Sequence, residues 1–419
     1  MTDVIEVPQQ EAPEQESVAE FRVRARAWLT AHVPLKTPGE SFLQWDDEGV
    51  ARSRAIQRAL WDGGLAGVHL PREYGGLGLS AAHQEAFREE AADFRMPEEF
   101  GNAFNVVVPT LLAHGSETLK RRHIWPILRG DAIWCQFLSE PSGGSDLAGL
   151  LTRADRTEGG FVLNGAKIWT TGGNYGDWAI CLARTNPDVP KHAGLTMFVV
   201  DMRTPGIEIA PVRLLDGSAD FCQEHIDDVF VPAENVVGEV DDGWRVATTL
   251  MVNERSAIGR GWSLAGQRGQ QEDTGIGLDP TLLDLAREVG RDTDPAVRAL
   301  IGERWVLNAV MAATTKRVGS ALRAGDLPGP AAAILKAMAG AVGPRAGEID
   351  LAVAGARAAA WPAGEENWGL HRLSSHGIGG GTTEMQRNAI AERLLGLPRE
   401  PSEDRVLPFR ELRHNTRPA

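Results

Sequence analysis

The chain has 419 residues, of which 42% are hydrophobic and 24% charged, enough for two or three packed subdomains with a shared core. Its 57 acidic and 43 basic residues give a net charge of −14, which disfavours binding to nucleic acid or anionic membranes. It contains no apolar run of about 18 residues, so membrane insertion is not expected. Residues 1–16 are acidic and rich in Pro, Gln and Glu, and we expect them to form a disordered tail on a cytoplasmic protein.

Helical spacing of apolar residues dominates the next part of the chain. Apolar side chains recur three or four positions apart in Val18–Trp28 and again in Ile56–Trp61. A stretch rich in glycine at Leu70–Gly78 interrupts the pattern. We therefore predict an N-terminal helical domain over residues 17–131.

Short β-rich runs separated by turn residues follow. They are Phe161–Leu163, Trp178–Ala183, Leu195–Val200 and Val229–Val231. Their length and spacing predict a small antiparallel β domain over residues 132–241.

Long segments rich in Ala, Leu and Arg return after Gly243. Pro295–Arg323 and Pro330–Ala360 predict long helices, and Gly266–Asp279 predicts a loop before them. We expect a helical bundle over residues 242–400 and a C-terminal tail over residues 401–419. The predicted fold class is therefore α+β and multidomain.

Three widely spaced cysteines are present, Cys135, Cys181 and Cys222. An odd number at such spacing supports neither a disulfide framework nor a zinc site. We interpret them as buried thiols, and no metal site is predicted.

Three motifs occur in order along this pattern of helices, strands and helices. Phe137–Asp146 and Asn164–Gly172 resemble the two flavin-binding signatures of the acyl-CoA dehydrogenase family, and Gly379–Arg387 resembles its C-terminal motif. The resemblance extends from about Val18 to Gly396. It implies the family's three-domain fold, in which an N-terminal α-helical domain precedes a central antiparallel β-barrel domain and a C-terminal four-helix bundle. It also implies FAD as cofactor and an acyl-CoA substrate.

A flavin ring is a flat apolar plate edged with donors and acceptors, so its site needs an aromatic wall and short polar groups. Trp169 and Thr171 supply both. The resemblance places Trp169 beside the ring and Thr171 near N5, with Leu138 and Ser139 at the pyrimidine edge. The alternative is that Trp169 is a core tryptophan in a hairpin and that the Ser/Gly/Asp run is an ordinary turn.

The resemblance also implies a full set of contact residues. The cofactor contacts are Phe137, Leu138, Ser139, Ser145, Trp169, Thr171, Arg287, Thr382, Thr383 and Glu384. The substrate contacts are Ser145, Val252, Arg255, Gly380 and Gly381.

The family's reaction needs a carboxylate to remove the α-proton of the thioester. In many members this base is a Glu directly before the Gly-Thr of the C-terminal motif, a position that falls on Gly380 here. Glycine cannot accept a proton, but its backbone N–H can still bind the thioester carbonyl as an oxyanion-hole donor.

A second arrangement in the family replaces the missing carboxylate. Isovaleryl-CoA and long-chain acyl-CoA dehydrogenases carry the base early in the C-terminal domain, just before an Arg, which matches Glu254 and Arg255. Burial against an apolar acyl slot would raise the pKa of Glu254, with Arg255 opposing the shift. We predict Glu254 as the base; the alternative is that the two residues form a solvated or helix-capping pair.

Three other groups near the motifs are weaker candidates for the base. Glu384 fits the flavin edge or the first turn of a helix capped by Thr382 or Thr383. Glu140 fits a structural role in the flavin turn, and His376 a packing or hydrogen-bonding one.

The nucleotide half of the cofactor has weaker matches. The family's Arg-Phe-Gly segment, whose Arg reaches the partner subunit's FAD diphosphate, is reduced to Ala286–Arg291, so Arg287 is the candidate and Arg291 the alternative. The family's Gln-x-x-Gly-Gly segment is reduced to Ala354–Arg357, where Arg357 could contact phosphate instead.

These features predict FAD-dependent oxidation of an acyl-CoA to the 2,3-enoyl-CoA, with electrons passed to an electron-transfer flavoprotein. The resemblance implies a homodimer or homotetramer. The alternatives are a non-catalytic or half-catalytic subunit that forms a heterotetramer with a related chain, and an acyl-CoA oxidase. The negative charge argues against a DNA-associated relative.

Overall fold

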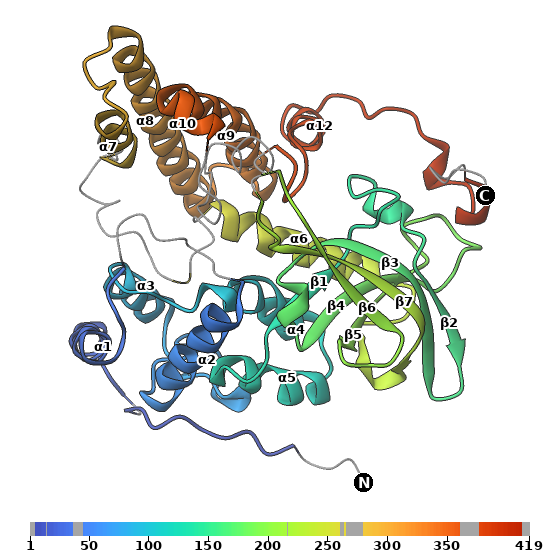
Figure 1. Ribbon diagram of the computed structural model, residues 1–419. Coiled ribbons are helices and arrows are strands. Elements are labelled where there is room, and N and C mark those ends of the chain that lie inside the picture. Colours follow the sequence, from blue (N-terminus) through green and yellow to red (C-terminus); the bar gives the residue numbers. More distant parts are fainter. Residues whose placement is uncertain are drawn as a thin grey trace.

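The computed structural model describes residues 5–13, 15–36, 45–215, 217–259, 264, 280–360 and 377–412 (Figure 1). A group of helices, one sheet and a second group of helices follow one another along the chain, which confirms the predicted three-part architecture. The predicted loop at Gly266–Asp279 and the candidate His376 lie outside the described residues.

Amphipathic helices form the first part. They are α1 Val18–His32, α2 Asp47–Asp62, α3 Ala81–Ala91, α4 Val108–His114 and α5 Glu117–Arg129. Ser17 begins α1 with a capping box in which Glu20 is the partner, and Phe21, Ala25 and Leu29 bury one face of the helix at four-residue spacing. Before α1, the Gln10 side chain exchanges hydrogen bonds of 3.0 and 2.7 Å with the backbone of Ala66.

The middle part is one eight-stranded sheet. Its strands are β1 Trp134–Phe137, β2 Arg153–Thr157, β3 Gly160–Thr171, β4 Trp178–Arg184, β5 Leu195–Asp201, β6 Ile207–Val212, β7 Phe221–Pro232 and β8 Val236–Val237. The order is β6-β7-β3-β2-β4-β5-β8, and β1 pairs with β4. The sheet is mixed rather than wholly antiparallel as predicted, because β4 pairs in parallel with both β1 and β2. After the first helices, β1 runs in the same direction as β4.

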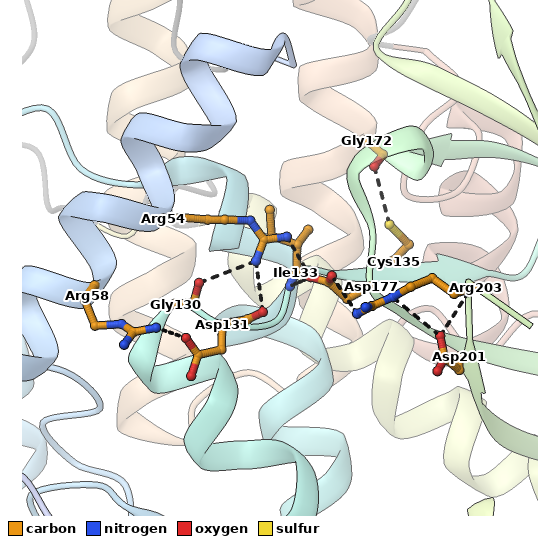
Figure 2. Close-up of polar contacts among 10 residues, drawn as sticks. All are labelled: Arg54, Arg58, Gly130, Asp131, Ile133, Cys135, Gly172, Asp177, Asp201 and Arg203. Atoms are coloured by element: carbon orange, nitrogen blue, oxygen red, sulfur yellow. Dashed lines mark hydrogen bonds and ion pairs between the residues drawn. The ribbon is translucent and has the colours of Figure 1, made fainter.

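A charged cluster joins the first helices to this sheet, as Figure 2 shows. Arg54 on α2 donates to Asp177 at 2.7 Å, and the same carboxylate accepts the backbone N–H of Ile133 at 2.9 Å. Arg203 approaches the other oxygen of Asp177 at 3.1 Å. Asp177 therefore fixes the entry of β1 against the start of β4.

Helices return after β8. They are α6 Gly243–Gly259, α7 Pro280–Glu288, α8 Pro295–Ala324, α9 Ala332–Ala354, α10 Ala356–Ala359 and α12 Thr383–Arg393. Helix α9 packs against α6, α8 and α12 and forms the centre of this part (Figure 1). The single helix predicted over Pro330–Ala360 is interrupted at Gly355, whose φ of 58° and ψ of −128° only glycine adopts readily.

The three cysteines are buried free thiols, as predicted. Burial raises the pKa of Cys135 and Cys222, and raises that of Cys181 to about 11, which disfavours the reactive thiolate. Within the described ranges, no three metal-binding side chains gather and no helix is long and apolar enough to cross a membrane.

Candidate active site

The first two sequence motifs meet at one edge of the β1–β3 contact. The backbone N–H of Ile168 donates to the Ser139 carbonyl at 3.0 Å, and Nζ of Lys167 donates to the Leu138 carbonyl at 3.1 Å. Leu138 and Ser139 are partly exposed, whereas the Phe137 side chain is fully buried in the sheet core. The Phe137 side chain is therefore not accessible to a ligand, and any contact from this residue would come from its backbone.

The loop after β1 is a tight turn. Backbone hydrogen bonds of 3.2 and 2.9 Å run in both directions between Glu140 and Gly143. Ser145 and its neighbours are exposed, so the turn presents amides and hydroxyls outward. This is the side of the turn where the resemblance places the pantetheine and thioester.

A buried ion pair stabilises that turn. Lys167 is fully buried and approaches Glu140 Oε1 at 3.0 Å while donating to the Leu182 carbonyl at 2.8 Å. Glu140 also accepts the backbone N–H groups of Leu151 and Thr152 at 2.6 and 2.9 Å. Burial alone would raise the pKa of Glu140, but the Lys167 charge and these hydrogen bonds lower it. Glu140 is therefore structural, in agreement with the sequence prediction.

Trp169 has a backbone conformation that few bulky residues adopt. Its φ is 68°, and the β3–β7 register shifts between Ile168 and Thr170. Strained residues of this kind occur mainly at functional sites. The bulge leaves Trp169 52% exposed, with Phe221 edge-on at 6.0 Å, so the alternative of a core tryptophan is wrong. Thr171 is also exposed, which places a broad aromatic face and a hydroxyl on one side of the sheet.

Sequence reasoning missed a buried carboxyl group beneath this bulge. Glu224 on β7 is fully buried and accepts the Thr170 hydroxyl at 2.7 Å through Oε2. Its Oε1 has no hydrogen-bond partner among the described residues, and a Cβ at Gly173 would lie 2.7 Å from it. Burial raises the pKa of Glu224 to about 7. The sequence carried a signal for this burial, because Glu224 lies two residues from Cys222 and from Ile226 and therefore on the same buried face of β7.

This raised pKa predicts a pH-dependent stability. A carboxyl group with a higher pKa in the folded than in the unfolded state destabilises the native state as pH rises, here between 4.5 and about 7. The loss is at most about 1.4 kcal/mol per pH unit. We expect Glu224→Gln to remove it, measured as the difference between urea unfolding free energies at about pH 5 and about pH 8. Glu208→Gln, an exposed carboxyl on the adjacent strand, is the control. An unchanged pH dependence in Glu224→Gln would contradict the assignment.

The C-terminal motif forms a glycine turn followed by a capped helix. Gly380 and Gly381 have φ of 68° and 91°, a left-handed conformation that costs other residues about 1–2 kcal/mol. Thr382 is the N-cap of α12 and accepts from the Met385 N–H at 3.2 Å, and Thr383 donates its backbone N–H to Gly377 at 3.1 Å. With the backbone conformation of this turn, a glutamate at position 380 would be strained, because its Cβ disfavours a positive φ.

The remaining carboxylate of this motif is solvent-facing. Glu384 lies exposed in the first turn of α12, where a negative charge favours the helix N-terminus. This position fits the first-turn helix role expected from the sequence.

Glu254 lies on the buried stripe of α6. Ala247, Leu250 and Ala257 on that helix are almost fully buried, and Glu254 follows them at helical spacing. Burial raises the pKa of Glu254, opposed by the charges of Arg255 and Lys336. Lys336 lies buried on α9, and sequence reasoning did not find it because nothing local connects it to α6. A carboxylate with a raised pKa is suited to proton abstraction near neutral pH.

Two predicted substrate contacts flank this residue. The Arg255 side chain is partly buried, and its pKa is lowered by burial despite the charge of Glu254. Val252 is 51% exposed and projects away from the buried stripe. A direct role for Val252 therefore requires a ligand or subunit that covers this side of α6.

The candidates for the FAD diphosphate differ in their present contacts. Arg287 is exposed on α7 and pairs with Asp284 at 2.9 Å, one turn away. Arg291 donates to the carbonyls of Ala352 and Val353 at 2.8 and 3.2 Å and so caps α9. Arg357 pairs with Glu288. Arg287 is the candidate best placed to reach a ligand or neighbouring subunit.

The groups brought together on the sheet fit a flavin. An exposed indole in a strained bulge, the Thr171 hydroxyl and the exposed turn after Ser139 provide a flat aromatic wall with polar groups at its edge. Because Ile168 and Ser139 are hydrogen-bonded, the wall and the turn share one rigid frame.

Comparisons with known proteins agree with this geometry. Models of the acyl-CoA dehydrogenase N-terminal, middle and C-terminal domains match residues 15–131, 135–229 and 241–395. Acyl-CoA dehydrogenase IpdE1 of Mycobacterium tuberculosis is 33% identical over 405 residues, which cover 92% of this chain and 99% of that protein. Acyl-CoA dehydrogenase FadE34 of the same organism is 36% identical over 82% of this chain, but the match spans only 46% of that protein.

Solved structures show the same fold. A structure titled "Tcur3481-Tcur3483 steroid ACAD" has a TM-score of 0.71 at 27% identity, covering 93% of this chain and 100% of that one. The ChsE4-ChsE5 complex from Mycobacterium tuberculosis has a TM-score of 0.60 at 25% identity, with the same coverage. The chain therefore belongs to the acyl-CoA dehydrogenase family of FAD-dependent oxidoreductases.

Proposed function

We propose that this protein oxidises an acyl-CoA to its 2,3-enoyl-CoA and that Glu254 removes the α-proton. The observation that carries the proposal is the position of Glu254, which is half-buried and in line with the buried apolar residues of α6, where burial raises its pKa. Position 380, the other place for a base in this family, holds a glycine in a left-handed turn. Bound FAD supplies the acceptor for the β-hydrogen, which leaves the substrate as hydride.

The chain's other residues orient the reactants. Trp169 and Thr171 form the wall and polar edge against which the flavin ring rests, and the exposed turn with Ser145 receives the thioester side. The backbone N–H of Gly380 donates to the thioester carbonyl, which stabilises the negative charge that develops when the α-proton leaves. The proton ends on the Glu254 carboxylate.

An electron-transfer flavoprotein is the partner that would accept the electrons, and the chain works as an oligomer. The exposure of Arg287 supports this assembly, because an arginine outside its own subunit's site can reach cofactor in a neighbour. A homodimer or homotetramer is the simplest form.

A second candidate is a subunit of a hetero-oligomer that acts on a bulky, ring-containing thioester. Two similar structures have titles that name a pair of chains, and one of these is called a steroid ACAD. The weak match of Ala354–Arg357 to the family's nucleotide segment also favours this candidate, because a partner chain could supply the missing contacts.

Anaerobic reduction of the purified chain tests the function directly. We expect yellow protein that bleaches on addition of one member of a panel of butanoyl-, isovaleryl-, hexadecanoyl- and cholanoyl-CoA. Protein that purifies colourless and takes up no FAD would contradict an independent enzyme and favour the subunit. Bleaching only by the sterol-derived thioester would assign a bulky substrate.

A further inference from the structure

The last described segment of the chain returns to the middle domain and contacts the β4–β5 loop and Arg184, which in turn contact the flavin turn and the residues after it. Residues Glu403–Leu412, here called the C-terminal strap, follow α12 and end beside the middle domain (Figure 1). The Phe409 N–H donates to the Val189 carbonyl at 2.9 Å, and the Arg410 N–H donates to the Pro187 carbonyl at 3.1 Å. The strap is therefore bonded to the β4–β5 loop.

One end of the strap enters a chain of charges that reaches the turn. Lys191 on the β4–β5 loop is buried and approaches Asp146 Oδ1 at 2.7 Å. The same ammonium group pairs with Asp404 of the strap. Asp146 is the last residue of the turn that contains Ser145. Asp404 therefore positions the Lys191 ammonium group, which pairs with the Asp146 carboxylate.

The other end of the strap covers a buried arginine. The Arg184 guanidinium lies 3.4 Å from the centroid of the Phe409 ring. Arg184 donates to the carbonyls of Ala148 at 2.5 Å and Lys191 at 3.0 Å. Burial lowers its pKa to about 10, so it is charged at neutral pH and depends on these partners. Through Ala148 it fixes the segment that follows Asp146.

We infer that the C-terminal strap positions the Ser145-containing turn for the acyl-thioester, with Asp404 acting through Lys191 and Phe409 acting through Arg184. Asp404 and Phe409 are positioning residues, because neither touches the proposed flavin wall. The two connections reach the turn at different residues, Asp146 and Ala148, and they are joined where Arg184 donates to the Lys191 carbonyl. Loss of the strap therefore loosens the turn without removing the Glu140–Lys167 pair that holds its other end.

Single-residue variants of the purified flavoprotein test this inference. We expect Asp404→Asn and Phe409→Ala to raise the KM for the thioester that bleaches the wild type fastest by about tenfold each, the effect of losing one charge-assisted contact. The kcat and the flavin content should stay within about twofold, because the base and the flavin wall are unchanged. Asp404→Glu and Phe409→Tyr, which keep the carboxylate and the aromatic ring, should restore most of the affinity.

The matched control is Glu411→Gln, which makes the same carboxylate-to-amide change at an exposed position of the strap. It should leave KM unchanged. An unchanged KM in both Asp404→Asn and Phe409→Ala overturns the inference. So does loss of kcat and flavin in proportion to loss of folded protein, since the strap would then be only a stabilising element.

Hydrogen exchange separates this inference from the proposed function on which its kinetic test rests. Backbone amides of residues 142–149 should exchange faster in Asp404→Asn and Phe409→Ala than in wild type, whether or not any thioester is oxidised. If no panel thioester reduces the wild type, the proposed function fails while the exchange result still decides the inference. Unchanged exchange at the turn in both variants overturns the inference alone.

Discussion

Glu254→Gln should keep the yellow colour of the flavoprotein and lose its reduction by acyl-CoA, with a rate lower by on the order of 10³-fold. Glutamine has nearly the same shape but cannot accept the α-proton. Flavin binding should persist because the substitution keeps the size of the side chain and Glu254 is not among the proposed flavin contacts. The measurement is the rate of anaerobic bleaching in a stopped-flow spectrophotometer, together with the flavin-to-protein ratio.

Two comparisons make this result specific. Glu158→Gln changes an exposed turn carboxylate in the same way and should leave the rate unchanged. Glu384→Gln tests the other carboxylate near the motif. A rate lost in Glu384→Gln but retained in Glu254→Gln would place the base on α12 instead.

The pH profile gives the same assignment by another route. The active form is the carboxylate, so kcat/KM should rise with pH through the pKa of Glu254, which burial places above its ordinary value of 4.5. The acid limb of the profile should therefore have its midpoint above that value. An acid limb at or below pH 4.5 would contradict a desolvated base.

Lys167→Met should destabilise the protein by about 3–5 kcal/mol and reduce its flavin content, because Glu140 would be left as a buried charge without its cation. The side chain of Glu140 is 4% exposed and that of Lys167 is fully buried, so water cannot compensate. The Lys167–Glu140 pair stabilises the turn after Ser139, which couples the stability of the protein to cofactor binding. Urea unfolding and the flavin-to-protein ratio measure the two effects.

A double variant distinguishes the buried charge from lost packing. Lys167→Met with Glu140→Gln should recover part of the stability, because the neutral amide removes the unpaired buried charge and its single oxygen can still accept one of the Leu151 and Thr152 N–H groups. The matched control is Arg153→Met, which breaks an exposed pair with Asp155 on the same sheet and should cost less than about 1 kcal/mol. Equal losses of unfolding free energy in Lys167→Met and Arg153→Met would show that the buried pair stabilises the protein no more than the exposed pair does.

Local patterns predicted the elements well where one rule acted alone. Phe161–Leu163 was expected as a strand and lies within β3, and Pro295–Arg323 was expected as a helix and forms α8 almost residue for residue. The spacing of apolar residues could not predict the interruption at Gly355, because glycine and alanine do not differ in such a pattern. Strand spacing likewise could not reveal that β4 would have parallel neighbours, which depends on the path of the chain through the first helices.

The candidate site divides in the same way. Trp169, Thr171 and Ser139 were identified from motifs, but the 68° φ that exposes Trp169 depends on how β3 pairs with β7. Glu224 escaped attention because a lone acidic residue in a strand is usually solvated. Its burial depends on the packing of the segment around Gly173 against it.

The sequence by itself determined the family, the FAD cofactor and the absence of a carboxylate at position 380, because each depends on residue types in a fixed local order. Only the tertiary structure decided that Glu254 is desolvated, that Lys336 acts on it from α9, and that Asp404 and Phe409 reach the flavin turn through Lys191 and Arg184. The physical reason is that burial and charge coupling depend on side chains from other elements. Those partners lie far away in the sequence and follow no local period.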